Sequence, residues 1–506
     1  MMDVFLNTCL VLLVRSGFVL VQLSSIPSLN VFVIIYQNVL DVALSIATFG
    51  SLGCVIAFGD DLIGIVGYKK WLPFNNATDT HNVIIGLLTT LIATGIVTTI
   101  LCGRISMCAY FFLVFLLSGF IQPAVIHWVW YTEGWLYSKE FLFTTVSFRD
   151  DSGGLTIHVF GGTVCLIGAL FFGRRLLLLS DISELSIGVE SPGISFVGYI
   201  FIIIGLIGFS LTSFDYGHQL TPNTGILIIN NLSAMSGGIL VIAFLQHFLF
   251  RRRISYWNIL RCIQGGVAGI VTISPGINLY KPEFAFLASL ISSATFYLFS
   301  TIILLKTSIE DYCNVISIHL VCGIFGLFLC PFFKDSDPIK QRLIQSLWQL
   351  LVTFTVIFFL IIVISILFFA LLLCRGLRNK LERIDHERGV LAVKNRGKDK
   401  TFLDRIFNVT SSTPFLEPGS SSRNPSQIES LREPTKSDDI IVRNVRFAYT
   451  IANVSKFDDI IDKNIGRNSG DHLNGSSSHY DLHRNMFSNH TSLKDDLSKC
   501  IHLQEV

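Results

Sequence analysis

Long apolar runs recur along most of the chain and constrain its fold more than any other feature. A helix needs about 20 mostly apolar residues to cross the roughly 30 Å of hydrocarbon in a bilayer. Eleven segments meet this requirement: 4–23, 31–58, 82–103, 107–130, 154–173, 194–213, 225–250, 257–275, 283–305, 313–332 and 346–374. The sequence therefore predicts an all-α membrane protein with eleven transmembrane helices.

The composition supports this interpretation. Of the 506 residues, 51% are hydrophobic and only 15% are charged, which is too apolar for a water-soluble chain of this length. The net charge of +2 gives no reason to expect a nucleic-acid partner, so the lipid bilayer is the expected surrounding. Most of the eleven cysteines fall inside apolar runs, which argues against a secreted disulfide framework.

The polar segments predict the domain organisation and the orientation. A membrane domain is expected over 1–375, a short basic cytosolic segment over 376–390 and a largely disordered cytosolic tail over 391–506. Arginines gather at 174–175, 251–253 and 375–383, on the side that the C-terminus shares. Because positive residues favour the cytoplasmic side, we expect a multi-pass plasma-membrane protein with its N-terminus outside and its C-terminus in the cytoplasm.

One pattern occurs in both the fifth and the tenth apolar run. The fifth is preceded by Asp150 and holds His158, eight residues later, and Gly162, four residues after that; the tenth is preceded by Asp311 and holds His319 and Gly323 at the same spacing. Five spans per half is an odd number, so the second half must insert upside down relative to the first. This predicts two inverted five-helix repeats plus a final helix, with one histidine from each half near the midplane.

These two histidines are the strongest candidates for function. An ionisable group in hydrocarbon is costly and marks a functional position by default, while neutral imidazole rings can face each other and pass a proton. The glycine one turn after each histidine would let two helices approach closely. A membrane histidine can instead serve only as an interhelical hydrogen-bonding group, and that is our interpretation of His127 and His247. The repeated spacing favours the functional role for His158 and His319.

The motifs around these histidines resemble the ammonium transporter family, which also contains the Rhesus proteins. Residues 150–162, D-D-S-G-G-L-T-I-H-V-F-G-G, are similar to its D-x-x-G-G-x-x-x-H-x-x-G-G signature. Residues 310–326 match its acidic pair followed by H-x-x-x-G-x-x-G, and 264–276, Q-G-G-V-A-G-I-V-T-I-S-P-G, resemble its N-G-x-x-A-G-L-V-x-I-T-x-G run. The resemblance covers about residues 8 to 390 and is nearer to the eukaryotic type of the ammonium transporter clade than to the Rhesus clade.

The resemblance implies a homotrimer with one hydrophobic pore through each subunit. Trp130 would recruit the ammonium ion at the external side by cation–π attraction, and Ser213 would accept a hydrogen bond from the same ion. Phe209 would form one half of a phenylalanine gate above the histidines. The basic segment 376–390 resembles the cytosolic regulatory segment of the family. Asp150, Asp311, Gly162 and Gly323 are expected to have structural roles.

Three positions depart from the family pattern. Ile85 stands where the second phenylalanine of the gate is expected. An aliphatic side chain still excludes water, but the cation–π attraction that a phenylalanine would provide is lost. Asn314 and Gln22 each replace an acidic residue.

The predicted function is an ammonium transporter or channel, which recruits the ion externally, deprotonates it and conducts ammonia past the two histidines. Ammonium or ammonia is the expected substrate, with methylammonium as an analogue, and no cofactor, metal or catalytic residue is expected. The alternative is a non-conducting ammonium sensor or regulatory subunit of the same fold, which Ile85 and Asn314 favour. A haem protein with histidine ligands is a further alternative. A hydrolase is the weakest, because no nucleophile elbow or H-E-x-x-H run occurs.

Overall fold

The structure, a computed structural model, describes ten stretches of the chain: 2–25, 31–69, 77–173, 192–211, 223–249, 256–307, 309–311, 313–334, 337–380 and 382–383. The chain divides into two units, 1–414 and 415–506. All described residues belong to the first unit. The predicted tail 391–506 lies outside the described residues, as does the part of segment 376–390 beyond residue 383.

The described residues are mostly helical, because a backbone in hydrocarbon must satisfy its polar groups within its own helix. The longer helices are α1 (Met2–Ser25), α2 (Val31–Thr48), α4 (Ala77–Leu101), α5 (Met107–Leu116), α7 (Phe160–Phe172), α8 (Pro192–Ser210), α9 (Thr224–Phe244), α10 (Tyr256–Ile273), α11 (Pro282–Lys306) and α13 (Ile339–Leu373). Shorter helices are α3 (Cys54–Phe58), α6 (Gln122–Trp130) and α12 (Cys322–Leu329). Wider π-helical turns continue several of them: η1 (Phe49–Gly53), η2 (Leu117–Ile121), η3 (Gly154–Val159), η5 (Leu245–Leu249) and η7 (Ile316–Val321).

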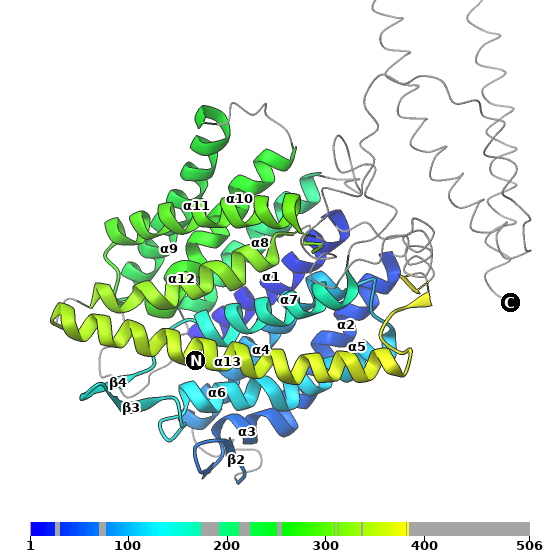
Figure 1. Ribbon diagram of the computed structural model, residues 1–506, viewed down its shortest axis with the longest axis horizontal. Coiled ribbons are helices and arrows are strands. Elements are labelled where there is room, and N and C mark those ends of the chain that lie inside the picture. Colours follow the sequence, from blue (N-terminus) through cyan, green and yellow to red (C-terminus); the bar gives the residue numbers. More distant parts are fainter. Residues whose placement is uncertain are drawn as a thin grey trace, which may run out of the picture. The chain divides into compact units, whose positions relative to one another are not determined.

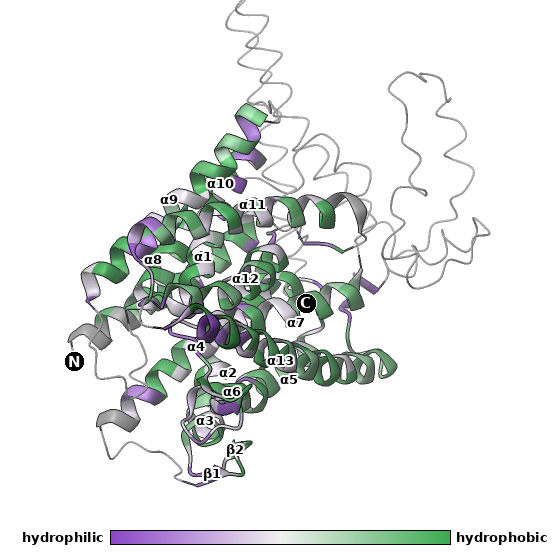
Figure 2. Cartoon of the chain, turned by 60° about the vertical axis from the view of Figure 1, so that its left-hand side comes forward, coloured by the Kyte–Doolittle hydropathy of each residue, from purple (hydrophilic) through white to green (hydrophobic). Residues whose placement is uncertain are grey.

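The prediction of a helical membrane protein is confirmed. Within the described part of the chain, ten continuous helical stretches are long and apolar enough to cross a bilayer, and each overlaps one of the predicted spans. The apolar part of the first predicted span, Thr8–Ser24, is shorter. Green helices dominate the hydropathy colouring in Figure 2. The count of eleven spans stays a prediction.

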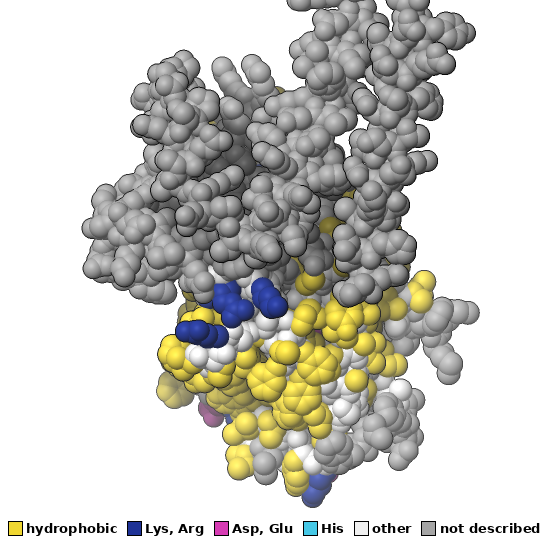
Figure 3. Space-filling view, turned by 90° about the vertical axis from the view of Figure 1, so that its right-hand side faces the viewer, with side chains coloured by type: hydrophobic (Ala, Val, Ile, Leu, Met, Phe, Trp, Pro, Cys, Tyr) yellow, Lys and Arg dark blue, Asp and Glu magenta, His cyan; other side chains and the backbone are white. Residues whose placement is uncertain are grey.

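The last helix, α13, shows how the molecule meets lipid. It crosses the other helices in Figure 1 and has 35 residues, a length of about 52 Å at 1.5 Å per residue. Since that exceeds the hydrocarbon thickness, α13 must tilt or project beyond it. Exposed apolar side chains recur along one face of it, from Ile339 through Leu343 and Leu347 to Phe358. In Figure 3, hydrophobic side chains cover much of the coloured, described surface, with Lys and Arg at the edges of that area.

Two short antiparallel strand pairs lie in the connections between helices. Strands β1 (Asp61–Leu62) and β2 (Val66–Gly67) pair antiparallel, and so do β3 (Ser138–Phe141) and β4 (Thr144–Ser147). The first pair links α3 to the region before α4, and the second, at the left of Figure 1, precedes the segment that carries Asp150.

The position of α1 inside the bundle is fixed by polar groups. Arg15 is 4% exposed, and its Nη2 atom lies 2.5 Å from Oδ2 of Asp41 on α2. Thr98 of α4 donates to the same carboxylate oxygen. Further along α1, Gln22 donates to Thr99 of α4. A charge buried in this way needs partners at defined positions, so these contacts set the register of α1 against α2 and α4.

Candidate functional site

The structure brings the two predicted histidines into direct contact. The Nδ1 atoms of His158 and His319 lie 3.1 Å apart, so one ring donates a hydrogen bond to the other. The ring centroids are 5.1 Å apart, with 17° between the ring planes. Both side chains are buried, at 1% and 3% exposure. Because a neutral imidazole has one donor and one acceptor nitrogen, one proton lies between the two Nδ1 atoms, and the tautomers of the rings decide which ring donates it.

Each histidine lies in a π-helical turn at the start of a span, His158 in η3 and His319 in η7. A helix begins with N–H groups that have no partner in the helix, and an aspartate accepts from them in both cases, buried at Asp150 and half-buried at Asp311. Asp150 accepts from the backbone and the hydroxyl of Thr156, and Asp311 accepts from the backbone of Val315 and Ile316. The eight-residue spacing therefore places a carboxylate under the first turn of each histidine-bearing helix.

Burial dominates the titration of these two aspartates, which precede the spans. It raises the pKa of Asp150 to about 6, although the N–H groups near Thr156 act in the opposite direction. It raises the pKa of Asp311 to about 6 as well, against the N–H groups of residues 315–317. Each carboxylate thus accepts hydrogen bonds from the N–H groups at a helix start, and it loses its own hydration in that position.

The two repeated glycines sit at the crossing of the histidine-bearing helices. A Cβ atom on Gly162 would lie 2.7 Å from the backbone N of Leu320, which follows His319. A Cβ atom on Gly323 would lie 2.9 Å from a methyl of Val159, which follows His158. Each helix therefore uses its glycine to approach the residue next to the other histidine. This reciprocity is the contact pattern of two inverted repeats.

The proposed external residues lie on other elements. Trp130 ends α6 and is 3% exposed, and its indole N–H donates to the backbone oxygen of Asp150 at 3.1 Å. Asp150 thus connects Trp130 to the helix of His158. Phe209 lies in the last turn of α8 and Ile85 lies on α4, and both are buried. Ser213 lies outside the described residues.

Two further histidines singled out in the sequence, His127 and His247, lie on other elements than this pair. The ring nitrogens of His127 face the backbone oxygen of Ala57 and the carboxylate of Asp61, each at 3.0 Å. His247 is exposed in η5. Among the described residues no group of three or more His, Cys, Asp or Glu side chains is arranged to hold a metal ion.

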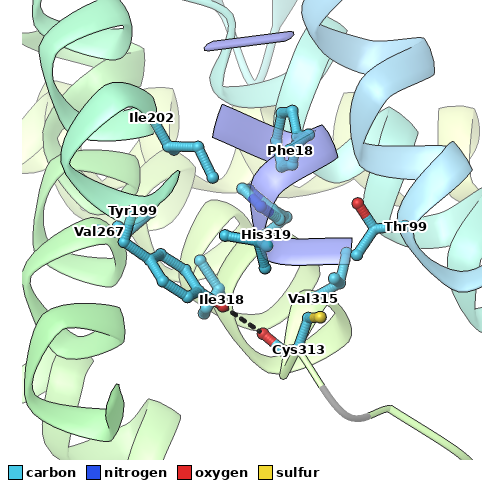
Figure 4. A pocket seen from close by; sticks show the side chains of 10 residues that line it. Phe18, Thr99, Tyr199, Ile202, Val267, Cys313, Val315, Ile318 and His319 are labelled. Atoms are coloured by element: carbon cyan, nitrogen blue, oxygen red, sulfur yellow. Dashed lines mark hydrogen bonds between the residues drawn. The ribbon is translucent and has the colours of Figure 1, made fainter. Parts of the chain in front are cut away.

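A small cavity adjoins His319, and its lining includes none of the motif residues 150–162. Its volume is about 10 Å³, at the lower limit of what holds one water molecule. Phe18 and Val21 of α1, Thr99 of α4 and Tyr199 of α8 contribute to its lining. Figure 4 shows Phe18, Thr99 and Tyr199 around His319. Thr99 and Tyr199 could not be predicted from the sequence, because a single hydroxyl-bearing residue within an apolar run forms no motif.

Comparisons with known proteins agree with this geometry. A family model described as the Ammonium Transporter Family matches residues 3–388. The chain belongs to this family. The ammonium transporter 1 member 3 of Solanum lycopersicum is 24% identical over 349 residues, which is 66% of this chain and 74% of that protein. A putative ammonium transporter of Synechocystis is 24% identical over 371 residues, covering 71% and 81%.

Solved structures in the ammonium transporter family share the fold. A protein described as a sensor Amt protein superimposes with a TM-score of 0.66 at 22% identity, covering 76% of this chain and 95% of its own. Mep2 of Saccharomyces cerevisiae gives a TM-score of 0.60 at 19% identity, covering 75% and 86%. The resemblance inferred from the motifs is therefore confirmed at the level of family and fold.

A second buried cluster, which the sequence did not reveal, lies where the segment that follows α13 meets the loop after α4. Arg104, 1% exposed, donates from Nε to Glu382 at 3.0 Å, and its Nη1 atom lies 3.8 Å from Glu310. Asn379 pairs with the backbone of Gly103 and Arg104. The start of the segment 376–390 thus packs on the loop after α4 and next to Asp311. Glu382, an acidic residue in a basic segment, was a possible signal in the sequence. Its partner Arg104 lies 278 residues away, so no local pattern links the two.

Proposed function

We propose that the protein moves ammonium across a membrane by removing one proton from the ion and conducting ammonia past His158 and His319. The observation that carries this proposal is the 3.1 Å contact between two buried imidazole nitrogens. Membership of the ammonium transporter family supports the substrate.

Selectivity follows from the chemistry of the ion. Ammonium and potassium have similar size, but only ammonium can give up a proton and continue as a neutral molecule. A dry, narrow path excludes potassium. The potassium ion keeps its charge, so entering the path costs several kcal/mol of hydration free energy that nothing in the path replaces. Two imidazoles that share one proton accept the proton at one side and release it at the other, so ammonia and proton travel separately.

The earlier steps use residues on the external side. The ion docks at Trp130 by cation–π attraction, with Ser213 as hydrogen-bond acceptor. It then loses its water shell at the constriction to which Phe209 and Ile85 contribute. Isoleucine at 85 keeps that constriction dry by dewetting but does not stabilise the cation.

The test is ammonium and methylammonium uptake by transport-deficient cells that express His158→Ala or His319→Ala. We expect both variants to lose selective uptake, because one imidazole alone cannot relay a proton. His247→Ala is the matched control, since that exposed histidine lies outside the pair, and it should transport like the original protein. Unchanged selectivity in both pair variants would contradict the proton relay.

A second candidate function is an ammonium sensor or regulatory subunit that binds the ion without conducting it. The substitutions at Ile85 and Asn314 favour it, and one structural neighbour is described as a sensor. Electrical recording separates the two functions: ammonium pulses produce a sustained current in a transporter and only a brief binding transient in a sensor.

We also propose a homotrimer with one pore per subunit in the plasma membrane, with the N-terminus outside and the segment 376–390 in the cytoplasm acting as a regulatory element. Residues 1–375 would form the membrane domain. Native mass spectrometry of the purified chain tests the oligomer, because a trimer of the 56.4 kDa chain is well separated from a dimer.

A further inference from the structure

Three of the ten cysteines that the structure describes are exposed: Cys9, Cys108 and Cys374. Cysteine is among the residue types most often buried in folded proteins, and six of the other seven described cysteines are buried. An exposed thiol is therefore the exception in this part of the chain. Two of the three, Cys108 and Cys374, lie close to the same junction between helices.

A short backbone pairing joins the start of α5 to the end of α13. Ile105, just before α5, forms an antiparallel bridge with Arg378, just after α13. The N–H group of Ser106 donates to the backbone oxygen of Leu377 at 2.9 Å, and its hydroxyl donates to the backbone oxygen of Gly376. Figure 1 shows the end of α13 beside α5. The two helix ends therefore lie at the same end of the bundle.

Cys108 and Cys374 each lie where a span meets this pairing. Cys108 is the second residue of α5, and Cys374 directly follows Leu373, the last residue of α13. Both helices belong to stretches that are long and apolar enough to cross a bilayer. A side chain at the end of such a stretch lies near the boundary between hydrocarbon and headgroups. Both thiols are therefore expected close to the surface of the bilayer.

The helix faces that carry the two cysteines are apolar and exposed. Phe111 and Phe112 are exposed on α5, three and four residues after Cys108, so they share its face. On α13, Ala370 is exposed four residues before Cys374. Exposed apolar side chains of a helix that crosses the bilayer face the acyl chains of lipids. A hydrocarbon chain attached to either sulfur would lie along such a face and stay in the bilayer.

Positive side chains border this region. Arg375 and Lys380 follow Cys374 and are exposed. Figure 3 views the molecule from the side where α13 ends in Figure 1, and Lys and Arg side chains border the hydrophobic surface there. Positive residues favour the cytoplasmic side of a span and attract anionic headgroups. Exposure, apolar surroundings and nearby positive charge are together the setting of an acylated juxtamembrane cysteine.

We propose that Cys108 and Cys374 are sites of S-acylation, at which a long-chain fatty acid is attached through a thioester. The cysteine sulfur attacks the carbonyl carbon of a fatty acyl coenzyme A. The new bond between carbon and sulfur replaces the bond to the coenzyme A sulfur, and the cysteine proton passes to the released coenzyme A thiolate. The step needs no oxidant or reductant. The proposal goes beyond transport and rests only on the proposed cytoplasmic side of segment 376–390.

The modification would tie the pairing of Ile105 with Arg378 to the bilayer. One acyl chain by itself gives weak and reversible attachment to a membrane, whereas two chains give stable attachment. The two cysteines lie on the two partners of this pairing, Cys108 after the first and Cys374 before the second. Acylation of both would therefore hold the two partners at the same bilayer surface.

The experiment counts thioesters on the full chain expressed in cultured eukaryotic cells. Cys500, outside the described residues, is changed to Ser in every version, so that only the cysteines of the membrane domain are read. Free thiols are blocked with a small maleimide, and neutral hydroxylamine then cleaves thioesters. A polyethylene glycol maleimide finally adds a fixed mass to each thiol that was released, and a gel separates the products.

We expect products with one and two added masses from the parent chain, and at most one added mass from Cys108→Ser or Cys374→Ser. Cys9→Ser is the matched control, because this exposed cysteine lies on α1, away from the pairing of α5 with α13. It should give the same two products as the parent. Equal expression of the four versions shows that the substitutions leave folding intact.

Several results would overturn the proposal. One is a parent chain without added mass after hydroxylamine, and another is an unchanged pattern in Cys108→Ser and Cys374→Ser. Masses that appear after a thiol reductant without hydroxylamine would reveal a disulfide instead of thioesters.

The proposed function is decided separately, because the mass shift needs no flux and ammonium uptake needs no acyl chain. The orientation has its own test, an epitope at the C-terminus. Antibody binding in intact cells would place that end outside and overturn both the orientation and this proposal, whereas binding only after permeabilisation supports them.

Discussion

Asp150 and Asp311 show what a single residue contributes to this site. Each lies before a span and accepts hydrogen bonds from the first turn of a histidine-bearing helix. Asp150 also offers its backbone oxygen to Trp130. Through these hydrogen bonds the two aspartates hold the first turns of the helices in place, and the positions of the histidines depend on them.

The pH dependence of Asp150 gives a prediction. Its pKa is about 6 in the folded protein and about 4 in an unfolded chain, so the folded state binds the proton more tightly. The stability that comes from the protonated form is complete below pH 4 and is lost as the pH rises through 6. Asn cannot titrate. We therefore expect the unfolding temperature of the original protein, measured relative to Asp150→Asn, to fall between pH 5 and pH 7; a constant difference would contradict it.

At the scale of elements, the site depends on two helices that cross at glycine. The histidines belong to η3 and η7, and the helices that continue them, α7 and α12, carry Gly162 and Gly323. Close approach brings the backbones near enough for the imidazoles to share a proton. The distance between the rings is therefore a property of helix packing as much as of the histidines.

Gly162→Ala tests this dependence. Its new Cβ would lie 2.7 Å from a backbone nitrogen, a contact that requires one helix to move. We expect a loss of about 1 to 3 kcal/mol in stability, as for other overpacked cores, together with reduced ammonium uptake. Gly50→Ala is the control, because a Cβ there would meet no atom within 4 Å. Equal uptake and equal unfolding temperature in the two variants would show that the crossing tolerates a side chain.

At the scale of the whole molecule, the segment after α13 joins distant parts of the chain. Arg104, after α4, contacts Glu382 near the end of the described residues and Glu310 next to Asp311. Arg378 of the same segment donates to the backbone of Phe171 at the end of α7. The described residues of segment 376–383 therefore connect the end of α7, which carries the first histidine-bearing half, to Arg104, which also contacts Glu310 before η7.

Glu382→Gln should loosen this connection. Removing one charge of a buried ion pair costs about 3 kcal/mol or more, although Glu310 remains near Arg104. We expect faster amide hydrogen exchange in residues 376–383 than in the original protein. Glu283→Gln, an exposed change in the first turn of α11, should leave the exchange rates as they are. Protection that survives Glu382→Gln would show that the backbone contacts of Asn379 alone hold the segment.

The sequence by itself determined the class of fold and the pair of histidines. The length of each apolar segment is a local property, because every span must cross the bilayer by itself. The Asp-to-His-to-Gly spacing occurs twice in the sequence, so it could be found without a structure. The tertiary structure alone decided the 3.1 Å contact between the rings, the cavity with Thr99 and Tyr199 and the partners of Arg104. Each of these joins residues from helices far apart in the chain, and their distances depend on how side chains pack, which no local pattern encodes.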